Sequence, residues 1–102
     1  MFSILQICDG AVGSLGEVWG QYAACRVTGL PAECRATDLR ASIKGTMLHV
    51  EDVGPADLEG RRTVNLKLPD EVATGYNLLR MEYAGASSEM EVRILGRRRA
   101  EE

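Results

Sequence analysis

The sequence predicts a single α+β domain in which one N-terminal helix packs on a mainly antiparallel, curved sheet of about five strands. Three observations support this class. A glycine-rich turn and an apolar stripe at helical spacing follow the first apolar segment. After Thr37 the hydrophobic period changes from helical to two, and turn signals separate the later segments. We assign residues 1–96 to the domain and residues 97–102 to a frayed, charged tail.

Length, composition and charge restrict the function classes. The chain has 102 residues, of which 45% are hydrophobic and 26% charged, as expected for one globular domain with one core. The net charge of −3 provides no general attraction to nucleic acid or to anionic membranes. No apolar run approaches the ~20 residues that span a bilayer. Three cysteines without C-x-x-C spacing argue against a disulfide framework, so we expect a cytoplasmic protein.

The N-terminal quarter predicts a strand followed by a helix. Residues 2–8 are a short apolar run, which favours a buried strand over a helix start. Ser14 and Glu17 match the capping box S-x-x-E, in which each side chain satisfies a free backbone amide. Gly29 and Pro31 end the segment, because glycine favours a left-handed cap and proline cannot continue a helix. We predict a helix over residues 15–28, whose apolar stripe contains Leu15, Val18, Trp19, Tyr22 and Cys25.

Two hairpins are predicted in the rest of the chain. A turn at residues 44–45 would place Ala41 opposite Leu48 and Leu39 opposite Val50, with both apolar sets on one face. One long strand with a bulge at the same place is the alternative, and we favour the hairpin.

After a strand at residues 63–68, the second hairpin is predicted to close at Gly85 and Ala86. This register sets apolar residues opposite apolar residues on one face and forms one pair of opposite charges. It also sets Glu82 opposite Glu89, which is a pair of like charges. The predicted pairs are Met81 with Met90, Leu79 with Val92 and Arg80 with Glu91.

No motif indicates a catalytic, cofactor or metal site. The stretch DGAVGSLGEVWG at residues 9–20 resembles a phosphate-binding turn in layout only, because no lysine follows it and Glu17 would repel an anion. The single histidine, His49, points away from the apolar face and suits a solvated position. The cysteines lack a histidine at metal-ligand spacing and are interpreted as small core residues: Cys8, Cys25 and Cys34.

The predicted geometry leaves part of the sheet uncovered. A helix of 14 residues covers about half the face of a sheet of five strands. Either the sheet curls into a half-barrel, or a second subunit covers the remainder, and we predict a two-fold homodimer. Gly16, Gly20 and Ala24 would form a smooth strip on the helix and are the predicted interface.

We therefore predict a small, self-associating binding module with no cofactor, metal or catalytic residue. A small apolar ligand would lie between helix and sheet, beside Trp19, Tyr22 and Tyr83. The alternative is a small enzyme whose helix–sheet cleft uses Tyr22, Tyr76 or Tyr83. A nucleic-acid-binding accessory protein is the weaker alternative, because the basic residues near the C-terminus are balanced by acids and lack interleaved aromatic residues.

Overall fold

The computed structural model describes residues 2–10, 15–19 and 21–95, and this part of the chain is almost entirely β. It contains eight strands and one turn of 3₁₀ helix, η1. The strands are β1 (Ser3–Asp9), β2 (Glu17–Val18), β3 (Tyr22–Thr28), β4 (Leu39–Ile43), β5 (Thr46–Val53), β6 (Arg62–Lys67), β7 (Gly75–Tyr83) and β8 (Ala86–Ile94), and η1 covers Ala36–Asp38. None of the described residues forms a helix long and apolar enough to cross a membrane.

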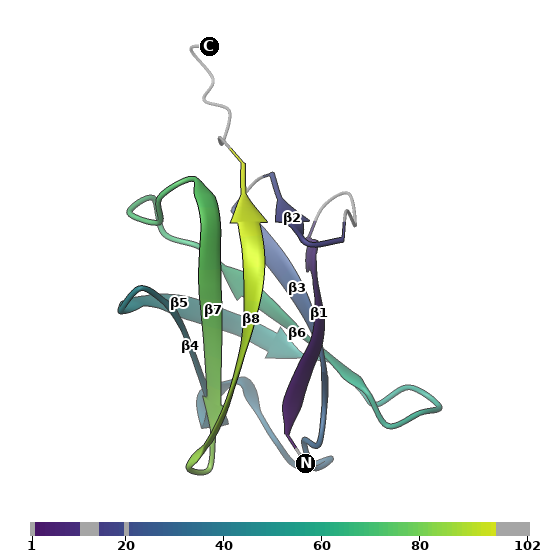
Figure 1. The fold of residues 1–102 in the computed structure, drawn as a ribbon. Coiled ribbons are helices and arrows are strands. Elements are labelled where there is room, and N and C mark those ends of the chain that lie inside the picture. The colour runs from purple at the N-terminus through teal and green to yellow at the C-terminus, as the bar shows by residue number, and fades with distance from the viewer. Residues whose placement is uncertain (1, 11–14, 20, 96–102) are drawn as a thin grey trace.

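The strands make one sheet that curls into a nearly closed barrel (Figure 1). Their order is β1-β3-β6-β5-β4-β7-β8-β2, and every neighbouring pair is antiparallel except β2 with β8. Gly16 joins the two ends of the sheet: its N–H donates to the carbonyl of Ile7 in β1 (2.6 Å), and its carbonyl accepts from Arg93 of β8 (2.9 Å). Lower along the same junction, the amide of Ile4 donates to the hydroxyl of Ser88 (2.9 Å).

The core fills the interior of this barrel. Side chains at alternating positions point inward, as the period of two requires, and a register shift interrupts this pattern in β1 and in β5. The largest fully buried side chains come from six of the eight strands and from the residue after β6: Ile7, Val18, Val27, Val64, Leu66, Leu68, Leu79, Met81, Val92 and Ile94. The barrel itself therefore encloses the apolar residues that the sequence had suggested a helix or a second subunit would cover.

The predicted helix over residues 15–28 is wrong, and with it the α+β class. Residues 22–28 form β3, which pairs with β1 on one side and with β6 on the other. Within β3 the alternating residues Ala23, Cys25 and Val27 are buried, whereas Trp19 and Tyr22 of the expected helical stripe are exposed. Pairing with two neighbouring strands satisfies the backbone on both sides, and this tertiary context overrides the local helical pattern. Ser14, the predicted cap, lies outside the described residues.

The first predicted hairpin is confirmed, and the bulged long strand is wrong. Ile43 pairs with Thr46 and Ala41 with Leu48. The turn residues both have positive φ, 50° and 81°, which is the type I′ geometry that matches the twist of a hairpin. The predicted pairing of Leu39 with Val50 is absent, because the ladder between β4 and β5 ends at Ala41.

The strand at residues 63–68 corresponds to β6, with alternate residues Val64, Leu66 and Leu68 buried. The second hairpin also exists, but its register is two residues away from the predicted one. Ala84 and Gly85 form the turn, with φ of 51° and 85°. A shift of two keeps every side chain on its predicted face. It also brings Arg80 opposite Glu89 and removes the expected conflict between two glutamates; the observed pairs include Leu79 with Met90, Met81 with Ser88 and Glu82 with Ser87.

Candidate functional site

The three predicted ligand-binding residues do not form one site. Trp19 and Tyr22 are exposed near the start of β3, at the top of Figure 1. Tyr83 lies at the other end of the barrel, where β7 ends in the bottom hairpin, and its ring contacts Phe2 with a centroid distance of 6.3 Å. Without a helix there is no cleft between helix and sheet in which the three side chains could meet.

The predicted interface strip has also lost its geometric basis. Gly16 is at the junction that closes the barrel, and Ala24 lies half-buried within β3. Gly20 lies outside the described residues. The strip required a helix, and of its two described members Gly16 lies before β2 and Ala24 within β3, so no helical surface joins them.

Two shallow hollows lie on the outside of the barrel, on either side of a ridge formed by Met47 and His49 of β5. The first has a volume of about 260 Å³ and the second of about 220 Å³. The first is lined by Ala36, Thr37, Leu39, Arg40, Met47, Leu48, His49 and Val50, and the second by Met47, His49, Lys67, Leu68 and Pro69.

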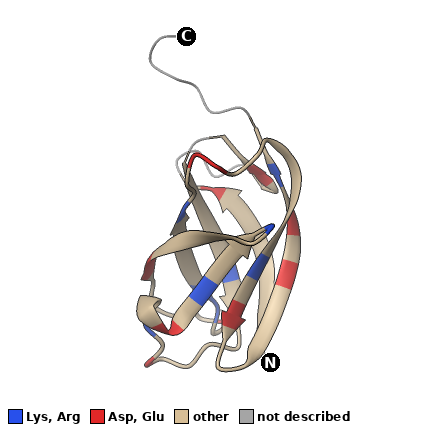
Figure 2. Cartoon of the chain, turned by 90° about the vertical axis from the view of Figure 1, so that its left-hand side faces the viewer, with Lys and Arg blue, Asp and Glu red and all other residues tan. Residues whose placement is uncertain are grey.

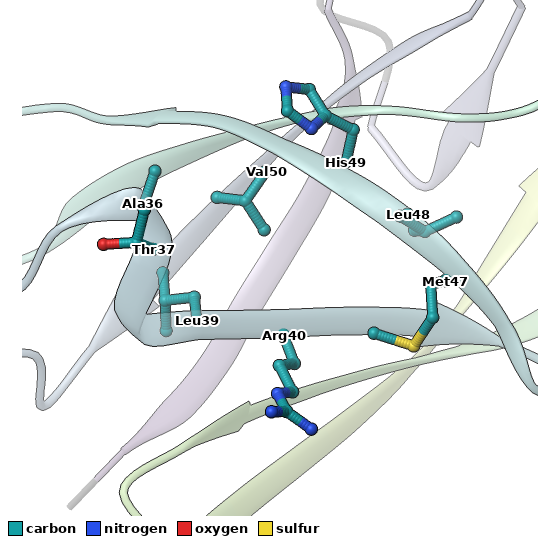
Figure 3. A pocket seen from close by; sticks show the side chains of 8 residues that line it. All are labelled: Ala36, Thr37, Leu39, Arg40, Met47, Leu48, His49 and Val50. Atoms are coloured by element: carbon teal, nitrogen blue, oxygen red, sulfur yellow. The ribbon is translucent and has the colours of Figure 1, made fainter.

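The first hollow arises because β4 and β5 separate. Their ladder stops at the pair Ala41 and Leu48, and beyond it the two strands diverge. In Figure 3 the gap widens toward Leu39 and Val50, and Ala36 and Thr37 lie at its wide end. The turn of helix η1 thus occupies the position where the strands would otherwise have continued to pair.

All charged or titratable side chains that line the hollows, among the described residues, are basic: Arg40, His49 and Lys67. Lys67 pairs in register with Tyr22 of β3 on one side and with His49 of β5 on the other. Its ammonium nitrogen is 6.0 Å from the centroid of the Tyr22 ring. We call Tyr22, Lys67, His49 and Arg40 the cationic row; it crosses four adjacent strands, β3, β6, β5 and β4.

Two members of the cationic row have no carboxylate within 4 Å among the described residues, Arg40 and Lys67. Glu82 is the register partner of Arg40, but its carboxylate accepts a 2.8 Å hydrogen bond from Nε of Arg80 instead. The side chain of His49 is 72% exposed, with Nε2 3.7 Å from the Glu51 carboxylate. Arg40 and Lys67 therefore present positive charges that no carboxylate of the described residues pairs with.

The directions of the side chains show what shape of ligand the row can contact. His49 and Arg40 project in opposite directions from the first hollow in Figure 3. One small anion would not reach both groups at once. A ligand that lies across the strands could contact both, with the exposed thioether of Met47 beside it at the narrow end of the hollow.

The two buried cysteines, Cys25 and Cys34, do not add chemistry to this surface. Burial, and to a smaller extent the Cys8 thiol, raise the pKa of Cys25 to about 12. Burial is also the main cause that raises the pKa of Cys34. Both thiols are protonated at neutral pH and are therefore poor nucleophiles and metal ligands. The described residues contain no cluster of three or more histidines, cysteines and acids that could hold a metal ion.

Only part of the cationic row could be predicted from the sequence. The hairpin register predicted from the sequence, with Ala41 opposite Leu48, also sets His49 opposite Arg40 on the face away from the core. Lys67 and Tyr22 join them only because β6 lies between β3 and β5, and this order is a non-local property of the barrel. Comparisons with family models, with curated proteins and with solved structures find no match to the chain.

Proposed function

We propose that the protein is a binding module that holds an extended anionic ligand across the outer face of β3, β6, β5 and β4. The observation that supports this proposal is the cationic row together with the two hollows beside it. Basic side chains would contact the negative groups of the ligand, and Met47 and Tyr22 would contact its apolar or planar groups. The module is the function class that the sequence favoured, but the ligand is anionic and lies on the outside of the barrel.

The dimensions of the row indicate a ligand with more than one negative group. Paired neighbouring strands are about 4.8 Å apart, and three such intervals lie between Tyr22 and Arg40. Because β4 and β5 diverge at this level, the two residues are separated by at least ~14 Å. A strand of nucleic acid and an acidic peptide both carry repeated charges over such a length. Single-stranded nucleic acid would in addition stack a base on an aromatic ring such as that of Tyr22.

The overall charge of the chain implies that this binding is local and sensitive to salt. The net charge is −3, and Figure 2 shows acidic and basic residues mixed over several strands rather than separated into large fields. The protein therefore does not attract a polyanion from a distance. Affinity depends on the contacts of the row itself, which salt screens because the side chains are exposed.

The enzyme alternative loses its support. It required a cleft between helix and sheet that gathered tyrosines, and no helix covers the described sheet. Tyr22 lies on β3, Tyr76 at the start of β7 and Tyr83 at its end, so the three hydroxyls do not converge.

Fluorescence anisotropy tests the proposal with two labelled probes, a single-stranded oligonucleotide and a poly-glutamate peptide. We expect one of them to bind at low salt, and Lys67→Glu to weaken that binding about tenfold, which corresponds to ~1.4 kcal/mol. Lys44→Glu is the matched control, because it makes the same change of charge at the exposed hairpin turn outside the row. Failure of both probes to bind, or equal weakening by the control, would rule out the cationic row as the binding surface.

A further inference from the structure

The outer face of β7 and β8 carries four neighbouring side chains, two large apolar ones on β7 and one acid and one base on β8. The two strands lie side by side at the front of Figure 1. Tyr76 pairs in register with Arg93, and Leu78 pairs with Glu91. Between these two pairs, Asn77 and Val92 point into the barrel and are buried, so the four neighbouring side chains project outward. We call Tyr76, Leu78, Glu91 and Arg93 the β7–β8 block.

Two large apolar side chains of this block are exposed next to each other. Tyr76 is 66% exposed and Leu78 is 49% exposed, two residues apart on the same face of β7. The Arg93 guanidinium lies over the Tyr76 ring, 5.7 Å from its centroid, and also lies 3.6 Å from the Glu17 carboxylate of β2. Glu91, by contrast, has no ion pair among the described residues.

The block is complementary to itself under a two-fold rotation. Two copies of the block can face each other across a plane, related by a two-fold axis that lies in this plane and crosses the strands at the level of Val92. This rotation reverses the strand direction, and it places β8 of one copy over β8 of the other and β7 over β7. Within one strand, the residues before and after Val92 are roughly 7 Å apart. Across the interface, the residue after Val92 in one copy faces the residue before Val92 in the other. Arg93 of one copy faces Glu91 of the other, and Tyr76 faces Leu78, each contact occurring twice.

We propose that the partner of this surface is a second copy of the chain, docked face to face and antiparallel through the β7–β8 block. Apolar groups meet apolar groups and each base meets an acid, which is the isologous arrangement that a two-fold interface requires. With parallel strands the two-fold axis runs along the strands and β8 lies over β7, so Arg93 would face Tyr76 and Glu91 would face Leu78. Only the antiparallel orientation sets each base against an acid, so the charges also favour that direction of docking. This interface is distinct from the ligand-binding function proposed above, because the cationic row lies on the other strands of the barrel.

Charge reversal tests this geometry directly. In Glu91→Arg both charged positions of the block are positive, and in Arg93→Glu both are negative, so each variant should repel its own copy. We expect the parent protein to sediment as a dimer at micromolar concentration, at twice the chain mass of 11.1 kDa. Each variant should sediment as a monomer. An equimolar mixture of the two should recover the dimer, because arginines of one chain then face glutamates of the other.

The double variant Glu91→Arg/Arg93→Glu should also dimerise, since it restores opposite charges across the axis. Glu51→Arg on β5 is the matched control and should leave the dimer intact. Circular dichroism checks that every variant is folded. A monomeric parent protein overturns the proposal, as does a dimer that survives either single variant. Single variants that are folded monomers but fail to associate when mixed would also overturn the antiparallel geometry and leave this face to a different protein partner.

Discussion

At the scale of single residues, Arg62 is a buried charged side chain that connects two loops. It is 6% exposed, and no carboxylate lies within 4 Å of it among the described residues. Its Nε donates to the carbonyl of Gly54 (2.8 Å), and a terminal nitrogen donates to the carbonyl of Pro31. The guanidinium thus links two loops that are far apart in the sequence, and its charge is compensated by carbonyl dipoles alone.

Replacing this side chain should reduce stability more than replacing its neighbour. Arg62→Met keeps much of the apolar stem but leaves both carbonyls without their donor, and buried hydrogen bonds from charged groups contribute about 1.5–3 kcal/mol each. We expect a loss of about 3 kcal/mol in the free energy of unfolding, measured by urea denaturation. Arg61→Met is the control: its ion pairs to Asp57 and Glu59 are partly exposed, so the loss should stay below about 1 kcal/mol. Equal losses in the two variants would show that the two carbonyl contacts of Arg62 do not stabilise the fold.

At the scale of elements, the two hairpin turns share one backbone geometry but differ in their first residue. Lys44 and Ala84 both have φ near +50°, and each is followed by a glycine with positive φ. The left-handed region is strained for a residue with a Cβ atom, least so for asparagine and glycine. Ala84 therefore carries strain that its side chain does nothing to relieve.

Ala84→Asn should accordingly stabilise the hairpin of β7 and β8, because Asn-Gly is the preferred pair for a type I′ turn. We expect a gain of about 0.5–1 kcal/mol, seen as a higher melting temperature. Ala86→Asn places the same side chain two residues later, on an exposed strand position, and should give no gain. A melting temperature that rises equally for both variants would contradict the role of the turn conformation.

Patterns of neighbouring residues were enough to locate these two hairpins in the sequence. The same kind of local pattern also gave the wrong prediction of a helix over residues 15–28. Alternation and an X-Gly turn are both properties of adjacent residues, so the hairpin of β4 and β5 could be predicted with its register. The residues around Tyr22 instead fit two periods: a stripe at helical spacing, and an alternation of Ala23, Cys25 and Val27. Which period applies depends on β1 and β6, and their positions beside this segment cannot be derived from its own sequence.

At the scale of the whole molecule, closure of the barrel changes how the apolar residues are distributed. An open sheet exposes one apolar face, and from that premise the sequence predicted a dimer over a glycine strip. The closed sheet buries that face inside itself, so the original reason for a dimer no longer holds and any association must use outward side chains. The candidate site has the same origin, since only the order β3-β6-β5-β4 aligns Tyr22, Lys67, His49 and Arg40.

Gly16 takes a direct part in closure, because its backbone bonds to both β1 and β8. Its φ is +74°, and a Cβ atom added there would meet no atom within 4 Å. Gly16→Ala should therefore cost about 1–2 kcal/mol through backbone strain alone. If that strain loosens the junction, the amides of Arg93 and Leu95, which donate to Gly16 and Val18, should exchange with solvent faster than in the parent protein.

Gly60→Ala provides the matched control for this prediction. Gly60 has φ of +81° and equally open space around it, but it lies in the loop between β5 and β6. The substitution should lower stability by a similar amount, while the amides of Arg93 and Leu95 keep their exchange rates relative to global unfolding. If both variants accelerate these two amides to the same extent, the junction opens only with the whole fold, and Gly16 is then no weak point of the barrel.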